Sequence, residues 1–212
     1  MNSTESSTKR SGVKALVAIV LALWFIVVYA LGASGLFVRT GGKPPLPILL
    51  GVTVPLLAFF VAYFGWAAFR AFVLAADLRL GAAIQAWRVG GLGFIALYVY
   101  GILPGEFALP AGLGDIAIGV TAPWIVIALI RRPGFANSTL FVTWNVLGIL
   151  DLIVAVGTGA MSSGFLPGFS GAVTTLPMSK LPLVLIPAYF VPIFVMLHLT
   201  ALFQSRVGSR KL

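Results

Sequence analysis

Six long apolar segments constrain this chain more than any other feature of its sequence. Each has close to the roughly 20 residues that a helix needs to cross the hydrocarbon core of a bilayer. We expect the spans at 15–38, 48–69, 80–103, 111–130, 138–157 and 182–203. In lipid a helix satisfies all of its own backbone hydrogen bonds. The sequence therefore predicts an all-α fold, a polytopic transmembrane helix bundle with six spans.

The composition supports a surface that faces lipid. Hydrophobic residues make up 60% of the chain and charged residues only 9%, whereas a soluble domain carries about a quarter charged residues. The net charge of +9 does not indicate nucleic acid, because the basic residues form short clusters between apolar runs and not one continuous face. We expect them to orient the spans and to contact the headgroups of the lipid bilayer.

The distribution of lysine and arginine predicts the orientation. With the N-terminus inside, eleven of the 14 basic residues lie on the cytoplasmic side and three, Arg39, Lys43 and Lys180, lie outside. The positive-inside rule therefore places both termini (N-in/C-in) in the cytoplasm, in a bacterial-type inner (plasma) membrane. The first span could instead be a signal peptide, but its apolar run exceeds the usual 7–15 residues or so, which favours a retained anchor.

The rest of the chain supplies short polar segments around one transmembrane domain, residues 13–206. We expect a disordered cytoplasmic N-terminus at 1–12 and a cytoplasmic tail at 207–212. The longest connection, the outer loop at 158–180, is rich in Gly, Ser and Pro. Both a flexible connection and a re-entrant lid fit that composition.

Four ionisable residues, Arg88, Asp115, Asp151 and His198, lie inside the predicted spans. On insertion scales each costs about 2.5–3.5 kcal/mol at the centre of a helix, so such residues usually face the bundle interior and mark function. Asn145 is a neutral polar companion in the fifth span. These positions are the candidates for a functional site.

Two of them are carboxylates on consecutive antiparallel spans. Asp115 and Asp151 are predicted near the outer ends of the fourth and fifth spans, with Glu106 in the loop above them. Two carboxylates in a low dielectric share a proton or recruit a cation. We therefore predict an ion- or proton-binding site that opens outward, formed by Asp115, Asp151 and Glu106, with Asn145 continuing the polar path.

A structural reading of the same acids stays open. Each aspartate can pair locally, with Lys180, Arg39 or helix-end amides, and then only hold the bundle together. The dipole at the start of the fourth span would also favour a charge at Asp115.

The two remaining residues have their own interpretations. His198, about five residues from the inner end of the predicted last span, is expected to be hydrogen-bonded near the headgroups, with a proton relay as the alternative. Arg88 is expected to extend to the interface or to pair with Asp77.

The sequence indicates transport more than catalysis. It has no cysteine and none of the zinc-protease, phosphate-loop or EF-hand patterns, so we predict no catalytic residue, metal or cofactor. The favoured function is a small transporter or channel-like protein for an ion, proton or small solute. The alternatives are a non-catalytic membrane subunit or assembly protein and, more weakly, a membrane-embedded enzyme acting on lipid. Six spans make a thin bundle, which leaves a homo-oligomer as an option.

Overall fold

The computed structural model describes residues 3–39, 42–169 and 171–209, and helices are the only regular elements among them. Six helical segments are long and apolar enough to cross a membrane. They are Gly12–Ala33, Leu46–Gly65, Leu78–Val99, Gly105–Arg131, Thr139–Met161 and Ile186–Val207. The predicted all-α fold with six spans is confirmed.

Two of these spans are built from more than one type of helix. The elements are α1 (Ser3–Ala33), α2 (Leu46–Gly65), α3 (Ala67–Leu74), α4 (Leu78–Ile84), the 3-10 segment η1 (Gln85–Gly91), α5 (Leu92–Val99), α6 (Gly105–Arg131), η2 (Phe135–Asn137), α7 (Thr139–Met161), η3 (Leu176–Ser179), the π-helical turn η4 (Ile186–Phe190) and α8 (Val191–Ser209). The third span is therefore α4, η1 and α5 in sequence, and the last span is η4 followed by α8.

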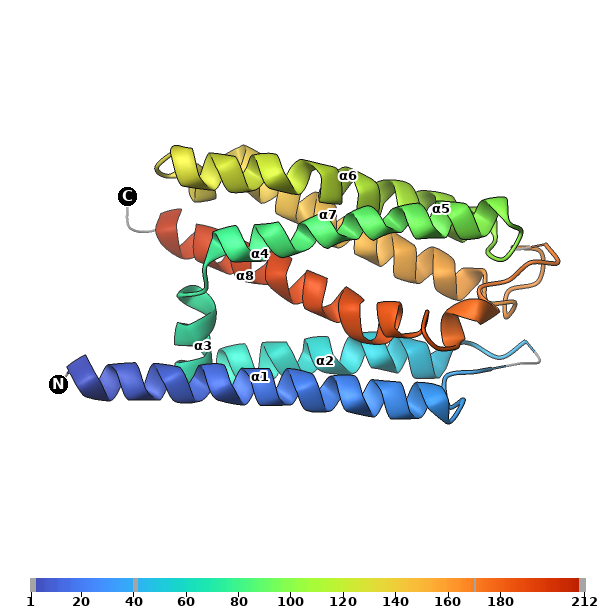
Figure 1. Cartoon of the computed structure of the whole chain (residues 1–212), viewed down its shortest axis with the longest axis horizontal. Helices are drawn as coiled ribbons and strands as arrows, with labels where there is room; N and C mark the ends of the chain where they lie inside the picture. Colours follow the sequence, from blue (N-terminus) through green and yellow to red (C-terminus); the bar gives the residue numbers. More distant parts are fainter. Residues whose placement is uncertain (1–2, 40–41, 170, 210–212) are drawn as a thin grey trace.

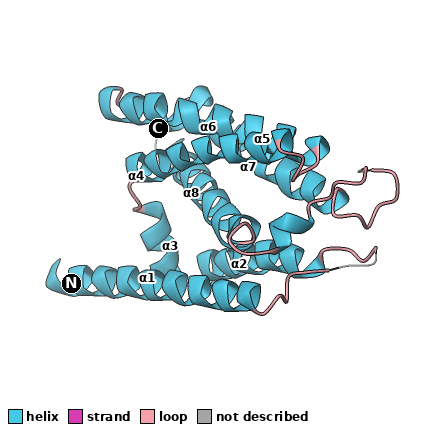
Figure 2. Cartoon of the chain, turned by 45° about the vertical axis from the view of Figure 1, so that its right-hand side comes forward, coloured by secondary structure: helices cyan, strands magenta, loops and turns pink. Residues whose placement is uncertain are grey.

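The helices form two layers with α8 between them (Figure 1). One layer contains α1 and α2, the other contains α4 to α7, and α3 crosses between the layers (Figures 1 and 2). The start of α1, the end of α8, α3 and the α6–α7 turn lie at one end, which we call the terminal end (Figure 1). The connections α1–α2, α5–α6 and α7–η3 lie at the opposite end, which we call the loop end. Of the six spans, α1 is the least buried.

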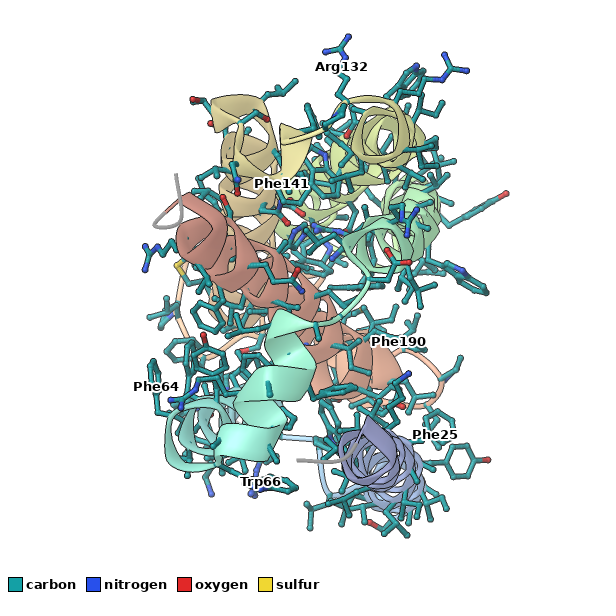
Figure 3. The ribbon with its side chains drawn as sticks, turned by 90° about the vertical axis from the view of Figure 1, so that its left-hand side faces the viewer. Phe25, Phe64, Trp66, Arg132, Phe141 and Phe190 are labelled. Atoms are coloured by element: carbon teal, nitrogen blue, oxygen red, sulfur yellow. The ribbon has the colours of Figure 1, made fainter. Side chains whose placement is uncertain are left out.

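The distribution of side chains is reversed relative to a soluble protein. Apolar side chains such as Phe25, Phe64 and Trp66 lie on the outside of the bundle (Figure 3), and Phe64 is 68% exposed. The largest fully buried side chains include Arg88 and His198. An apolar exterior around a polar interior is the arrangement that lipid favours, because hydrocarbon offers polar groups no hydrogen bonds.

Several helices extend beyond the predicted boundaries. The chain is helical from Ser3, inside the tail predicted to be disordered; α6 begins at Gly105, and α8 continues to Ser209. Adding residues to an existing helix is far easier than nucleating one, so polar flanks continue an apolar span. The last span begins at Ile186 and not at residue 182. The ends of the predicted tails, 1–2 and 210–212, lie outside the described residues.

Glycines bring the third span unusually close to α6. A Cβ atom at Gly91 would lie 2.6 Å from the Cβ of Asp115, and one at Gly119 would lie 2.5 Å from the backbone nitrogen of Val89. Small residues at such positions let helix backbones approach one another. This approach places η1, and with it the middle of the third span, directly against α6.

A methyl group at this contact should be destabilising. Gly119→Ala would push against the backbone of Val89, which cannot rotate away, and we expect overpacking to cost about 1–3 kcal/mol. Gly157→Ala on α7 is the matched control, since a Cβ there meets no atom within 4 Å. Thermal unfolding in detergent measures the difference, and equal midpoints for the two variants would contradict this account of the contact.

Candidate functional site

A buried arginine lies at the centre of the bundle. Arg88 is in η1, at the middle of the third span, and its side chain is 0% exposed. Its Nε atom donates a hydrogen bond of 2.7 Å to Oδ1 of Asp115, and its Nη2 atom donates to Oδ2 of Asp151. The two carboxylate side chains are 14% and 11% exposed. We call these three residues the charge triad.

The third nitrogen of the guanidinium connects the triad to His198. Nη1 of Arg88 donates to the carbonyl of Gly148 at 3.3 Å and lies 3.2 Å from Nε2 of His198. Arginine has no acceptor atom, so Nε2 must accept this hydrogen bond. The imidazole is then the neutral tautomer with its proton on Nδ1.

That tautomer agrees with the next contact. Nδ1 of His198 is 2.9 Å from Oδ1 of Asn145, so the ring donates to the amide oxygen. Nδ2 of Asn145 donates to the carbonyl of Phe141 at 2.8 Å, which fixes the orientation of the amide. We call the triad, His198 and Asn145 together the polar network. It links the third, fourth, fifth and last spans.

Two glycines make room for the network. A Cβ atom at Gly114 of α6 would overlap the carboxylate of Asp151, and one at Gly148 of α7 would overlap the ring of His198. The carbonyl of Gly148 is also an acceptor for Arg88. Glycine at these two positions therefore leaves room for polar side chains of neighbouring helices and also lets the helix backbones pack closely.

The charges of the triad do not balance. One guanidinium faces two carboxyl groups, and the neutral histidine adds no charge. Among the described residues, no other lysine or arginine is ion-paired with Asp115 or Asp151. With both carboxyl groups ionised the triad has a net charge of −1 in a low dielectric, which favours the binding of one proton or one external cation.

A cavity connects Asp115 with the loop end of the bundle. It measures about 820 Å³ with its open mouth included, and Asp115 is part of its wall. Arg39 and Lys43 of the α1–α2 connection lie at the mouth, and the walls are mostly apolar, with Phe94 and Phe107 among them. This loop-end cavity opens a route from the surface to Asp115 of the triad.

The structure brings four of the five predicted site residues into one network. Asp115 and Asp151 meet on one guanidinium, and Asn145 and His198 follow in the same chain of hydrogen bonds. Glu106 does not join them: it is exposed in the first turn of α6 and is absent from the lining of the loop-end cavity.

The predicted environments of Arg88 and His198 were wrong. Arg88 neither extends to the interface nor pairs with Asp77; Asp77 instead pairs with Arg79 at 3.1 Å, and that side-chain hydrogen bond lowers the pKa of Asp77. His198 lies near the middle of its span and not at the headgroups, because α8 continues to Ser209. The triad is deeper than predicted for the same reason, since α6 and α7 extend beyond the expected boundaries.

One buried polar residue next to the network was not predicted. Gln85 lies in η1 three residues before Arg88 and is 1% exposed. Its Nε2 atom donates to the carbonyl of Phe194 at 3.2 Å. Residues three apart share a helix face, so the spacing from Arg88 was the available signal.

The fold and this network define the class: a multi-pass helical membrane protein whose interior polar groups converge on one arginine. The chain belongs to the family described as a domain of unknown function (DUF8737), whose model matches residues 45–205. The matched range contains every member of the polar network and leaves α1 outside. No curated protein and no solved structure matches the chain.

Removing the central cation should destabilise the bundle. Arg88→Met leaves two buried carboxyl groups without their partner, and breaking a buried ion pair in this way costs about 3–5 kcal/mol. Adding Asp115→Asn and Asp151→Asn to Arg88→Met should restore much of the loss, because no buried charge remains. Arg79→Met is the control, since its ion pair is exposed. Chemical unfolding in detergent tests this, and a triple variant no more stable than Arg88→Met would count against it.

Proposed function

We propose that this protein is a small transporter that exchanges protons for an organic cation at the charge triad. The observation that carries the proposal is the loop-end cavity, which extends from the surface to a carboxyl group of a triad with one cation and two acids. The single unpaired negative charge can be neutralised by a proton or by a cationic solute, but not by both at once. Because a proton and a cationic solute compete for this one charge, the transport of one is coupled to the transport of the other.

The walls of the cavity support an organic cation over a bare metal ion. Calcium and magnesium ions require about six or more oxygen ligands. The cavity is mostly apolar, and among the described residues Asp115 is the one carboxylate in its lining. Phe94 and Phe107 pack edge to face, with ring centroids 5.3 Å apart. Aromatic rings attract cations that have apolar substituents, such as quaternary ammonium groups.

The basic residues at the mouth do not prevent entry of a cation. Arg39 and Lys43 are exposed. The Debye length at physiological salt is about 8–10 Å, and beyond that distance the interactions of exposed charges are largely screened. Asp115 is largely buried, where electrostatic interactions are stronger. The orientation predicted from lysine and arginine would place this mouth on the outer side of the membrane.

A second candidate function is that of a non-catalytic membrane subunit. The observation that favours it is that Arg88 already contacts both acids. In this case the triad would only hold the four spans together, and the purified protein would move neither protons nor cations.

Flux measurements with an aspartate series separate the two functions. Proteoliposomes with an internal pH-sensitive dye and an imposed gradient of benzyltrimethylammonium should show coupled proton movement. Asp115→Asn and Asp151→Asn each remove the unpaired charge and should slow exchange at least about tenfold, which corresponds to 1.36 kcal/mol or more.

Glu106→Gln provides the control, because Glu106 is an exposed carboxylate outside the triad that lines no described cavity. Its flux should equal that of the parent. Absence of flux in the parent, or parental flux in Asp115→Asn, would refute exchange at the triad.

A further inference from the structure

A second cavity approaches the polar network from the opposite direction. It measures about 530 Å³ with its open mouth included and lies between α4, α7 and α8, with Asp77 and Thr200 toward the terminal end. Its deepest polar lining residues are Gln85 and Asn145. Thus the loop-end cavity reaches the network at Asp115, and this terminal-end cavity reaches it at Asn145, the other end of the same hydrogen-bonded chain.

Gln85, which lines the terminal-end cavity, also has an unsatisfied acceptor. Oε1 of Gln85 is buried and has no hydrogen-bond partner among the described residues. Leaving such a group unpaired costs about 1–3 kcal/mol, so buried polar atoms of this kind are normally satisfied by ordered water. A water molecule needs enough room and polar partners. The cavity next to Gln85 has the room, and Gln85 and Asn145 are the deepest polar groups of an otherwise mostly apolar lining.

We propose that the terminal-end cavity is a second, water-filled entrance, and that the polar network is the closed barrier between the two entrances. This inference goes beyond the proposed function, because it concerns access and does not depend on which solute binds at the triad. The occupant that it assigns to the terminal-end cavity is water, with Gln85 and Asn145 as its deepest contacts.

The chemistry of the barrier explains how both entrances can exist without a leak of protons. The path between Asp115 and Asn145 consists of Arg88 and His198. Arginine stays protonated in proteins, so it cannot accept a proton from one side and release it on the other. With Arg88 in place, the network interrupts proton transfer while both cavities remain hydrated.

The absence of cysteine from the chain makes this arrangement directly testable with single-cysteine variants of the full-length protein. Leu197→Cys and Thr200→Cys report on the terminal-end cavity, and Ala160→Cys reports on the loop-end cavity. Val61→Cys is the control that faces lipid, since Val61 is 73% exposed on α2. Arg132→Cys, at the α6–α7 turn, marks the terminal end (Figure 3).

A charged, membrane-impermeant methanethiosulfonate reagent is added to oriented vesicles from each side in turn. Thiols react as thiolates in contact with water. Leu197→Cys and Thr200→Cys should react from the side on which Arg132→Cys reacts, and Ala160→Cys from the other side. From either side, Val61→Cys should react on the order of tenfold more slowly than the cavity positions.

A further substitution tests the role of Gln85. Gln85→Leu removes the unsatisfied acceptor and makes the deep end of the cavity more apolar, so it should slow the labelling of Leu197→Cys and leave that of Arg132→Cys unchanged. Failure of both Leu197→Cys and Thr200→Cys to react, while Arg132→Cys reacts, would overturn the second entrance. Because labelling requires no transport, this result is distinguishable from a failure of the flux experiment.

Discussion

The burial of one guanidinium is the constraint on which the rest of this structure depends. An arginine at mid-span cannot be hydrated by lipid, so it requires acceptors from its own chain. Arg88 obtains three of them from two other spans: Asp115 of α6, and Asp151 and the carbonyl of Gly148 of α7. The fork of the guanidinium has a fixed geometry, and it therefore sets where α6 and α7 can lie relative to the third span. His198 brings α8 into the same arrangement.

Glycines and charge act together in this arrangement. Glycines at the contact between η1 and α6 allow the close approach, while Gly114 and Gly148 leave room for a carboxylate and an imidazole. The result is a thin polar layer at the middle of the bundle with a cavity on each side of it. A closed layer between two opposed cavities is the arrangement that the proposed exchange across a membrane requires. Under that proposal, the excess of acid over base in the triad would make this layer sensitive to a cation.

The fold was largely predictable from the sequence, and the site only in part. The lengths of the apolar segments alone predicted six spans, because a single-chain segment crosses the hydrocarbon core almost only as a helix that satisfies its own backbone hydrogen bonds. The proximity of Asp115 and Asp151 followed from two consecutive antiparallel spans. The depth of His198 did not follow, because α8 continues past the predicted span and polar residues that extend a helix are not visible in a count of apolar residues. The ends of the third span were predicted within a few residues, and the burial of Arg88 was missed because its long side chain was expected to reach the interface or Asp77. Gln85 was missed because a single neutral side chain gives little signal.

The central claim is that the triad holds two carboxyl groups and one protein cation, so that one carboxyl group carries a proton when no cationic solute is bound. Infrared spectroscopy of the purified protein at neutral pH tests this most directly, since a protonated carboxyl group has its own C=O absorption. We predict one such absorption in the parent and in Asp77→Asn, and its loss in both Asp115→Asn and Asp151→Asn, because each of these two changes balances the triad. A parent protein without this absorption, with both aspartates ionised and no cation bound, would contradict the account.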